Sequence, residues 1–223
     1  MATLGQRITD LIGSDYEVIP SVTYNDLIRA AVNETVDNLP NDLLLKYCYY
    51  KTNITAAGLD SVEEKKVLMV AREIDDSTLE IRECIAVPYN EFLKVQDTNS
   101  LYCATIESPV YTYDVSTAND PKLKIFPVPT DAQLGYVWHF NYIGTGNDTA
   151  AESSIGGLPD ICLQAIVYRA CVNILQSYIS DFVQDEEDSE MLAMLSTQMQ
   201  SLQGAYTLEM QRFTETDKQP RGE

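Results

Sequence analysis

The sequence contains few basic residues. Its 223 residues include 15 lysines and arginines against 34 aspartates and glutamates, so the formal net charge is -19 at pH 7. A protein that grips nucleic acid by its phosphates needs a concentrated patch of lysine and arginine, and no such concentration occurs in this sequence. Tight binding to nucleic acid or to an anionic membrane surface is therefore disfavoured.

Long apolar runs and a signal peptide are also lacking. No stretch approaches the roughly 20 apolar residues that cross a bilayer. Residues 1–15 lack the basic and apolar regions of a signal peptide. We therefore expect an intracellular chain with no membrane partner. Its 45% of hydrophobic residues is nevertheless enough to build a core.

Histidine is nearly absent, and the cysteines are scattered. His139, the only histidine, lies in a predicted strand, where a sheet or surface role is more common than a catalytic one. The cysteines are odd in number and widely spaced, which predicts reduced, buried thiols and no zinc site. They are Cys48, Cys84, Cys103, Cys162 and Cys171. We therefore predict no catalytic residue, no metal and no cofactor.

Two further motifs have simple structural explanations. Acidic residues gather between Asp181 and Glu190, but they lack the glycine and the alternating spacing of a calcium loop. Carboxylates near a helix N-terminus interact favourably with the positive end of the helix dipole, and this explains the acidic cluster without a metal ion. Gly144, Thr145 and Gly146 lack the lysine of a phosphate-binding loop.

The first part of the chain has the pattern of helices. Thr3 is placed to cap a short helix that runs to Ile12. A second helix is predicted over residues 24–38, where apolar residues recur at spacings of three and four, with Thr23 as its cap. Residues 42–51 suit a helix or a strand equally well.

The middle third has the pattern of β-structure. Short runs rich in β-branched and aromatic residues alternate with turn residues. The predicted strands cover residues 67–74, 79–87, 101–107, 110–115, 122–126 and 134–142. The first two predict a hairpin with residues 75–78 in its loop, and residues 88–95 predict one or two helical turns. We therefore predict an antiparallel β region over residues 62–145.

Two long helices are predicted near the end of the chain. The first, over residues 161–182, is apolar around most of its circumference and is expected at the centre of the core. Its narrow polar stripe consists of Arg169, Asn173, Gln176 and Ser180. The second, over residues 186–213, has a thinner apolar seam, which is a core face or a surface buried on assembly. Gly204 inside it costs about 1 kcal/mol relative to alanine, which suggests a close contact or a bend. Residues 214–223 predict a mobile tail.

Together these elements predict an α+β protein with a single domain. Helices over residues 1–58 and 158–213 form its core, and an antiparallel β region over residues 62–145 is inserted between them. Residues 146–157 are rich in Asn, Asp, Ser and Gly and predict a flexible loop.

Several short motifs occur in an order that is similar to that of a known family. They are Thr3 to Gly5, Thr23 to Leu27, Leu39 with Pro40, Lys122 to Pro129 leading into Val137 to Tyr142, and Leu158 to Asp160 with Tyr168 and Arg169. In this order they resemble the head-to-tail connector proteins of tailed bacteriophages, also called adaptor, neck or head-completion proteins. The likeness spans nearly the whole chain, although each motif is short.

The resemblance implies a non-enzymatic virion protein. Family members form a ring, usually of twelve subunits, that docks under the portal protein after DNA packaging and carries the tail or nozzle proteins. Their fold is a helical core with an inserted β region, and the C-terminal segment commonly inserts against the portal. By this likeness we expect Arg212, Phe213, Lys218 and Arg221 to contact the portal. The protein would assemble in the host cytoplasm and reside in the neck of the virion.

The acidity suits such a ring. Genomic DNA passes through the channel, and a lumen lined by carboxylates repels phosphates, so the DNA slides without specific binding.

Two other functions stay open. A tail-completion or terminator ring would share this composition and the habit of forming oligomers. A metal-dependent hydrolase would need inward-facing carboxylates with shifted pKa values in a pocket, whereas the acidic runs here lie in predicted loops and helix starts.

Overall fold

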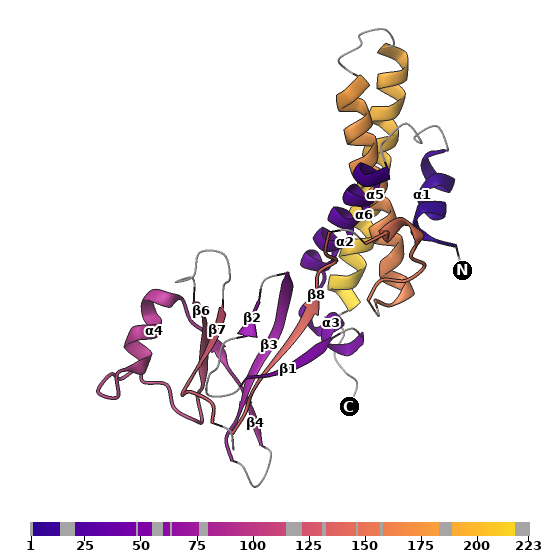
Figure 1. The fold of residues 1–223 in the computed structure, drawn as a ribbon. Coiled ribbons are helices and arrows are strands. Elements are labelled where there is room, and N and C mark those ends of the chain that lie inside the picture. Colours follow the sequence, from indigo (N-terminus) through magenta and orange to yellow (C-terminus); the bar gives the residue numbers. More distant parts are fainter. Residues whose placement is uncertain are drawn as a thin grey trace. The chain divides into compact units, whose positions relative to one another are not determined.

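The computed structural model describes residues 2–13, 21–47, 49–54, 60–62, 64–75, 80–114, 122–130, 133–145, 147–156, 158–182 and 189–216. The chain divides into two compact units, a helical unit of Met1–Cys48 with Ile143–Glu223 and a β unit of Tyr49–Tyr142 (Figure 1). Both ends of the chain therefore contribute to the helical unit, and the β unit is inserted between them. The fold class is α+β, as predicted.

The helical unit is built around α5 (Asp160–Phe182). This helix packs against α1 (Leu4–Ile12), α2 (Ser21–Asn38) and α6 (Ser189–Thr216) (Figure 1). Fully buried side chains occur along much of its length. They include Leu163, Ile166, Ala170, Ile174 and Leu175. The prediction that this broadly apolar helix is central is confirmed.

The start of α1 follows its sequence closely. The Thr3 hydroxyl accepts a hydrogen bond from the backbone N–H of Gln6 at 3.2 Å, and the Gln6 side chain accepts one from the Thr3 N–H at 3.1 Å. This capping box satisfies amides that a helix start leaves unpaired. Gly13 ends the helix with a φ of 88°, in the left-handed region that favours glycine. Leu4 and Ile8, one turn apart, are buried.

The start of α2 lies earlier than predicted. Ser21 is already helical, so Thr23 lies within the first turn and is not the cap. Threonine is only slightly unfavourable inside a helix, so the helical hydrogen bonding extends back past Thr23 to Ser21. The prediction that Thr23 caps this helix is wrong.

The ambiguous segment after α2 contains both a helix and a strand. Helix α3 (Asn41–Tyr47) is followed by strand β1 (Tyr50–Ile54). The β unit therefore begins within residues 1–58, which were predicted to be helical. β1 forms because it pairs along its length with a strand near His139, and such a distant partner leaves no trace in the local pattern.

The β unit contains two four-stranded sheets. Their other strands are β2 (Asp60–Ser61), β3 (Lys65–Glu73), β4 (Ile81–Glu83), β5 (Ile85–Ala86), β6 (Val110–Asp114), β7 (Lys122–Phe126) and β8 (Gly135–Asn141). The strand orders are β1-β8-β3-β4 and β2-β7-β6-β5. The described neighbours are antiparallel except β5 and β6, which are parallel. The prediction of a wholly antiparallel region is therefore wrong.

Two predicted strands differ in the structure. The run over residues 79–87 divides at Cys84, so β4 joins β3 in the first sheet and β5 joins β6 in the second. Cys84 itself is 4% exposed and enters the core, which anchors the crossing point. Residues 101–107 form turns with one isolated bridge. Their strand-forming composition is overridden by side chains just upstream that hydrogen-bond to the backbone of the turn.

The core of the β unit joins the two sheets. Buried residues from β1, β3 and β8 contact residues of β7. The cluster comprises Ile54, Val62, Val70, Cys84, Leu123, Ile125 and Val137. A smaller cluster joins helix α4 (Tyr89–Gln96), which was predicted as one or two helical turns, to β6 through Phe92, Val95 and Val110.

The segment predicted as a flexible loop, residues 146–157, is ordered where it is described. It contains the short 3-10 helix η2 (Thr149–Ala151). The Ala150 N–H donates to the Asn25 side chain at 3.0 Å, and the Leu4 N–H donates to the Glu152 carbonyl at 2.8 Å. These bonds tie the segment to α1 and α2, which its polar composition did not predict. Among the described helices, none has the length and hydropathy of a membrane span.

Candidate functional site

The end of α6 carries the described part of the expected portal-binding residues. α6 ends at Thr216, three residues beyond the predicted end, and Lys218 and Arg221 lie outside the described residues. The Arg212 side chain is 71% exposed and forms an ion pair with Glu209 at 2.7 Å. Phe213 is 4% exposed. The helix therefore presents Arg212 outward and packs Phe213 into the helical unit.

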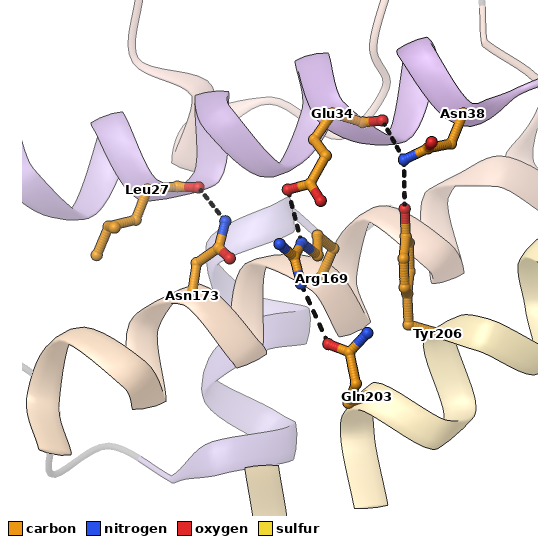
Figure 2. Close-up of polar contacts among 7 residues, drawn as sticks. All are labelled: Leu27, Glu34, Asn38, Arg169, Asn173, Gln203 and Tyr206. Atoms are coloured by element: carbon orange, nitrogen blue, oxygen red, sulfur yellow. Dashed lines mark hydrogen bonds and ion pairs between the residues drawn. The ribbon is translucent and has the colours of Figure 1, made fainter. Parts of the chain in front are cut away.

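A polar junction joins α2, α5 and α6 (Figure 2). Arg169 of α5 donates through Nε to the Glu34 carboxylate at 2.7 Å and through Nη1 to the Gln203 side chain at 3.1 Å. Its guanidinium carbon also lies 5.8 Å from the centre of the Tyr206 ring. One arginine thus contacts both neighbouring helices, because a guanidinium offers several donors in a fixed plane.

Three further hydrogen bonds extend the junction along α2 (Figure 2). The Asn38 amide donates to the Tyr206 hydroxyl at 3.4 Å and to the Glu34 carbonyl at 2.9 Å. The Asn173 amide donates to the Leu27 carbonyl at 3.5 Å. Arg169 and Asn173 belong to the polar stripe of an otherwise apolar helix, so their side chains fix how α2 and α6 pack on α5. The junction is suited to holding the C-terminal helix in place.

His139 is a buried residue of the first sheet. It is 3% exposed, its Nε2 lies 2.9 Å from the Thr52 hydroxyl, and its ring stacks on Tyr50 with 6.0 Å between centroids. These contacts match the predicted role of a sheet residue.

Sequence reasoning missed a buried acidic group in the β unit. Glu73 is 4% exposed, and its carboxylate accepts hydrogen bonds from the Tyr136 hydroxyl and from the Leu134 N–H, the latter at 2.8 Å. The bond to Glu73 raises the pKa of Tyr136, and burial raises it further. Lys51 lies over the Tyr136 ring at 3.7 Å. Only the position of Glu73 within an apolar strand hinted at this burial.

The neighbouring Arg72 is also buried, at 2% exposure. Its guanidinium donates to the carbonyls of Glu73 at 3.1 Å and Val128 at 3.3 Å, and to the Gln133 side chain at 3.4 Å. Burial lowers the pKa of Arg72, but an arginine remains charged near neutrality. It ties β3 to the segment that precedes β8, which is a structural role.

The described cysteines behave as small core residues. Cys84, Cys162 and Cys171 are buried, Cys103 is half-buried, and none of these four forms a disulfide. Burial raises the pKa of Cys84 and of Cys171 to about 12, so these thiols stay protonated near neutral pH. Protonated, buried thiols are poor nucleophiles and poor metal ligands.

Carboxylates do not gather into a metal site in the described part of the chain. No group of three or more His, Cys, Asp or Glu side chains is placed to hold a metal ion there. Of the acidic cluster between Asp181 and Glu190, only Glu190 has a described side chain, exposed in the first turn of α6. A pocket in the helical unit, lined by Asn147, Thr149, Ser154 and neighbouring residues, contains a single carboxylate, that of Glu152.

A scan against protein-family models finds no match for this sequence, and a search of curated proteins finds no significant match.

Proposed function

We propose that the chain is a structural protein of a tailed-bacteriophage virion that forms the adaptor, or neck, ring between the portal and the tail. The observation that carries the proposal is the architecture. A helical unit made from both ends of the chain has a β unit inserted after α3. This is the arrangement that the resemblance to connector proteins implies, and the residues that carry that resemblance run from Thr3 to Arg169.

The charge distribution supports the passage of DNA. Of the 34 acidic residues, 20 lie in the helical unit, together with only 7 of the 15 basic residues. Described carboxylates on its surface include those of Asp10, Asp26, Asp37 and Asp42, all on exposed residues. In a ring, a channel lined by such groups repels DNA phosphates, so DNA moves through without being held.

The portal contact is proposed for the end of α6 and the residues after it. Arg212 is exposed and basic in a strongly acidic chain, and Lys218 and Arg221 follow it in the sequence. Phe213 is buried, so it serves to anchor the last turns of α6 on the helical unit and leaves the contact to the basic residues. The polar junction at Arg169 holds the same helix closer to its start, at Gln203 and Tyr206.

Imaging of assemblies tests the ring. The full chain, alone and mixed with the portal protein of the same virus, is examined by light scattering and negative-stain microscopy. We expect rings of about twelve subunits on the portal. Rings of six would favour the tail-terminator alternative, and a monomer that binds a metal and hydrolyses a substrate would favour an enzyme.

A truncation tests the portal contact. A chain that ends at residue 213 removes Lys218 and Arg221 while keeping Phe213 in place. We expect it to keep its fold by circular dichroism and to lose portal binding. Unchanged portal binding would contradict the proposed role of these residues, and Arg212→Ala in the full chain then shows whether the exposed arginine acts alone.

A further inference from the structure

Strand β5, helix α4 and the turns after the helix expose an unusual number of large apolar side chains. The residues are Ile85 at 62%, Tyr89 at 42%, Leu93 at 66%, Leu101 at 101%, Tyr102 at 77% and Ile106 at 38% exposure. We call them the α4 surface. With roughly 200 Å² of accessible surface for a residue of this size, they expose on the order of 800 Å². Single exposed apolar side chains are normal on a monomer, whereas several exposed together mark an interaction site.

The α4 surface is built on an ordered scaffold. Phe92 and Val95 bury one face of α4 against β6, so Tyr89 and Leu93, one turn apart, share an outward side. The Ala104 N–H donates to the Val95 carbonyl at 2.9 Å, which folds the following turn back onto the end of α4. The exposed residues of this segment are therefore held near one another.

Hydrogen bonds also fix the tip of the turn. The Asn99 N–H donates to the Asp97 side chain at 2.9 Å, and the Tyr102 N–H donates to the Ser100 hydroxyl at 3.1 Å. The Ser100 N–H reaches the Asp97 carbonyl at 2.9 Å. A turn held in this way presents Leu101 and Tyr102 with little conformational entropy left to lose on binding.

We propose that a second copy of this chain covers the α4 surface. The exposed area matches the roughly 800 Å² that each partner buries in a standard protein interface. The charge distribution also favours a second copy as the partner. The β unit holds 8 of the 15 basic residues and 14 of the 34 acidic ones, so it is less acidic than the helical unit. Two copies of an acidic chain repel each other less through this unit.

This inference deepens the proposed function, on which it rests, by naming a contact between copies of the chain.

Sedimentation velocity of the full chain over a range of concentrations tests this contact. We expect the wild-type chain to self-associate, and more strongly at higher salt, because salt screens the repulsion between acidic copies. The double variant Leu101→Ser with Tyr102→Ser should weaken the association at least about tenfold, since buried aromatic and aliphatic anchors dominate interfaces.

A matched control uses another exposed leucine. Leu208 on α6 is 62% exposed and lies outside the α4 surface, so Leu208→Ser should leave the association unchanged. Circular dichroism checks that each variant folds. A wild-type chain that stays monomeric at every concentration overturns the inference. So does a double variant that associates like the wild type, or a control that weakens the association equally.

Ring formation on the portal is scored separately, so the two proposals can fail independently. If the double variant forms portal-bound rings as readily as the wild type, the α4 surface is not the contact and the adaptor function stands. If the wild-type chain self-associates through the α4 surface but forms no ring with the portal, the adaptor function fails.

Discussion

Two glycines of this chain occupy opposite environments. Gly204 lies in α6, and a methyl group added there would meet no atom within 4 Å. Gly135 begins β8, and a methyl group there would lie 2.7 Å from the Ile125 Cδ1 atom and 3.1 Å from Pro129. The first glycine therefore has no close contact within the described residues, whereas the second allows two strands and a proline ring to approach closely.

Gly204→Ala should stabilise the chain. Alanine is favoured over glycine within a helix by up to about 1 kcal/mol, and the open space at this position removes any steric penalty. Urea unfolding followed by circular dichroism should show a higher midpoint with an unchanged slope. An equal or lower midpoint would mean that the α6 backbone at Gly204 departs from a regular, exposed helix.

Gly135→Ala, in contrast, should destabilise the chain. Its methyl group would force the buried Ile125 and Pro129 to move, and overpacking of a filled core costs typically 1–3 kcal/mol. We expect a lower urea midpoint for this variant in the same measurement. If both alanine variants shift the midpoint in the same direction, the difference between the two sites is not steric.

At the scale of the element, the polar junction links three helices through one arginine. Arg169 and Glu34 are 21% and 41% exposed, so their ion pair is partly screened by water. A double-mutant cycle with Arg169→Ala and Glu34→Ala should give a coupling of about 0.5–1 kcal/mol. Arg169→Ala alone should cost more, because it also loses the bond to Gln203 and the contact with Tyr206.

The Arg212–Glu209 pair provides the control for this cycle. It has the same 2.7 Å separation, but Arg212 is 71% exposed and the two residues lie on the same helix. Its coupling should be smaller, at about 0.3 kcal/mol. A coupling between Arg169 and Glu34 no larger than this value would show that their ion pair does not help to hold α2 on α5.

The sequence predicted the elements whose signals are local. The cap at Thr3, the apolar circumference of α5 and the β-branched and aromatic composition of β8 are all properties of neighbouring residues. The failures depend on distant partners. β1 needs β8, β5 pairs in parallel with β6, and Thr23 gives no signal that the helix already starts at Ser21. The buried charges of Arg72 and Glu73 were also missed, because their partners come from the segment before β8 and from β8 itself.

For the candidate site, too, the sequence predicted the features that depend on neighbouring residues and missed those that depend on distant partners. The sequence placed Arg169 and Asn173 on one polar stripe of a helix, but it could not show that the stripe meets Glu34 of α2 and Gln203 of α6. It also grouped Phe213 with the exposed Arg212, although adjacent helical residues point in different directions.

At the scale of the whole molecule, each of the two units has its own buried core. We expect residues 49–142, expressed alone, to fold with the strand content that they have in the full chain. Circular dichroism and a cooperative thermal transition of this fragment would check it. A fragment that gives a random-coil spectrum would mean that the β unit depends on the helical unit for its stability.

The first and last strands of the β unit are neighbours in one sheet. Tyr50 of β1 lies opposite His139 of β8, so the chain enters and leaves the β unit at adjacent points. An evolving gene could therefore exchange this module for another by joining two nearby ends, with little loop-closure penalty. Related chains could then keep one helical scaffold while carrying different inserted modules.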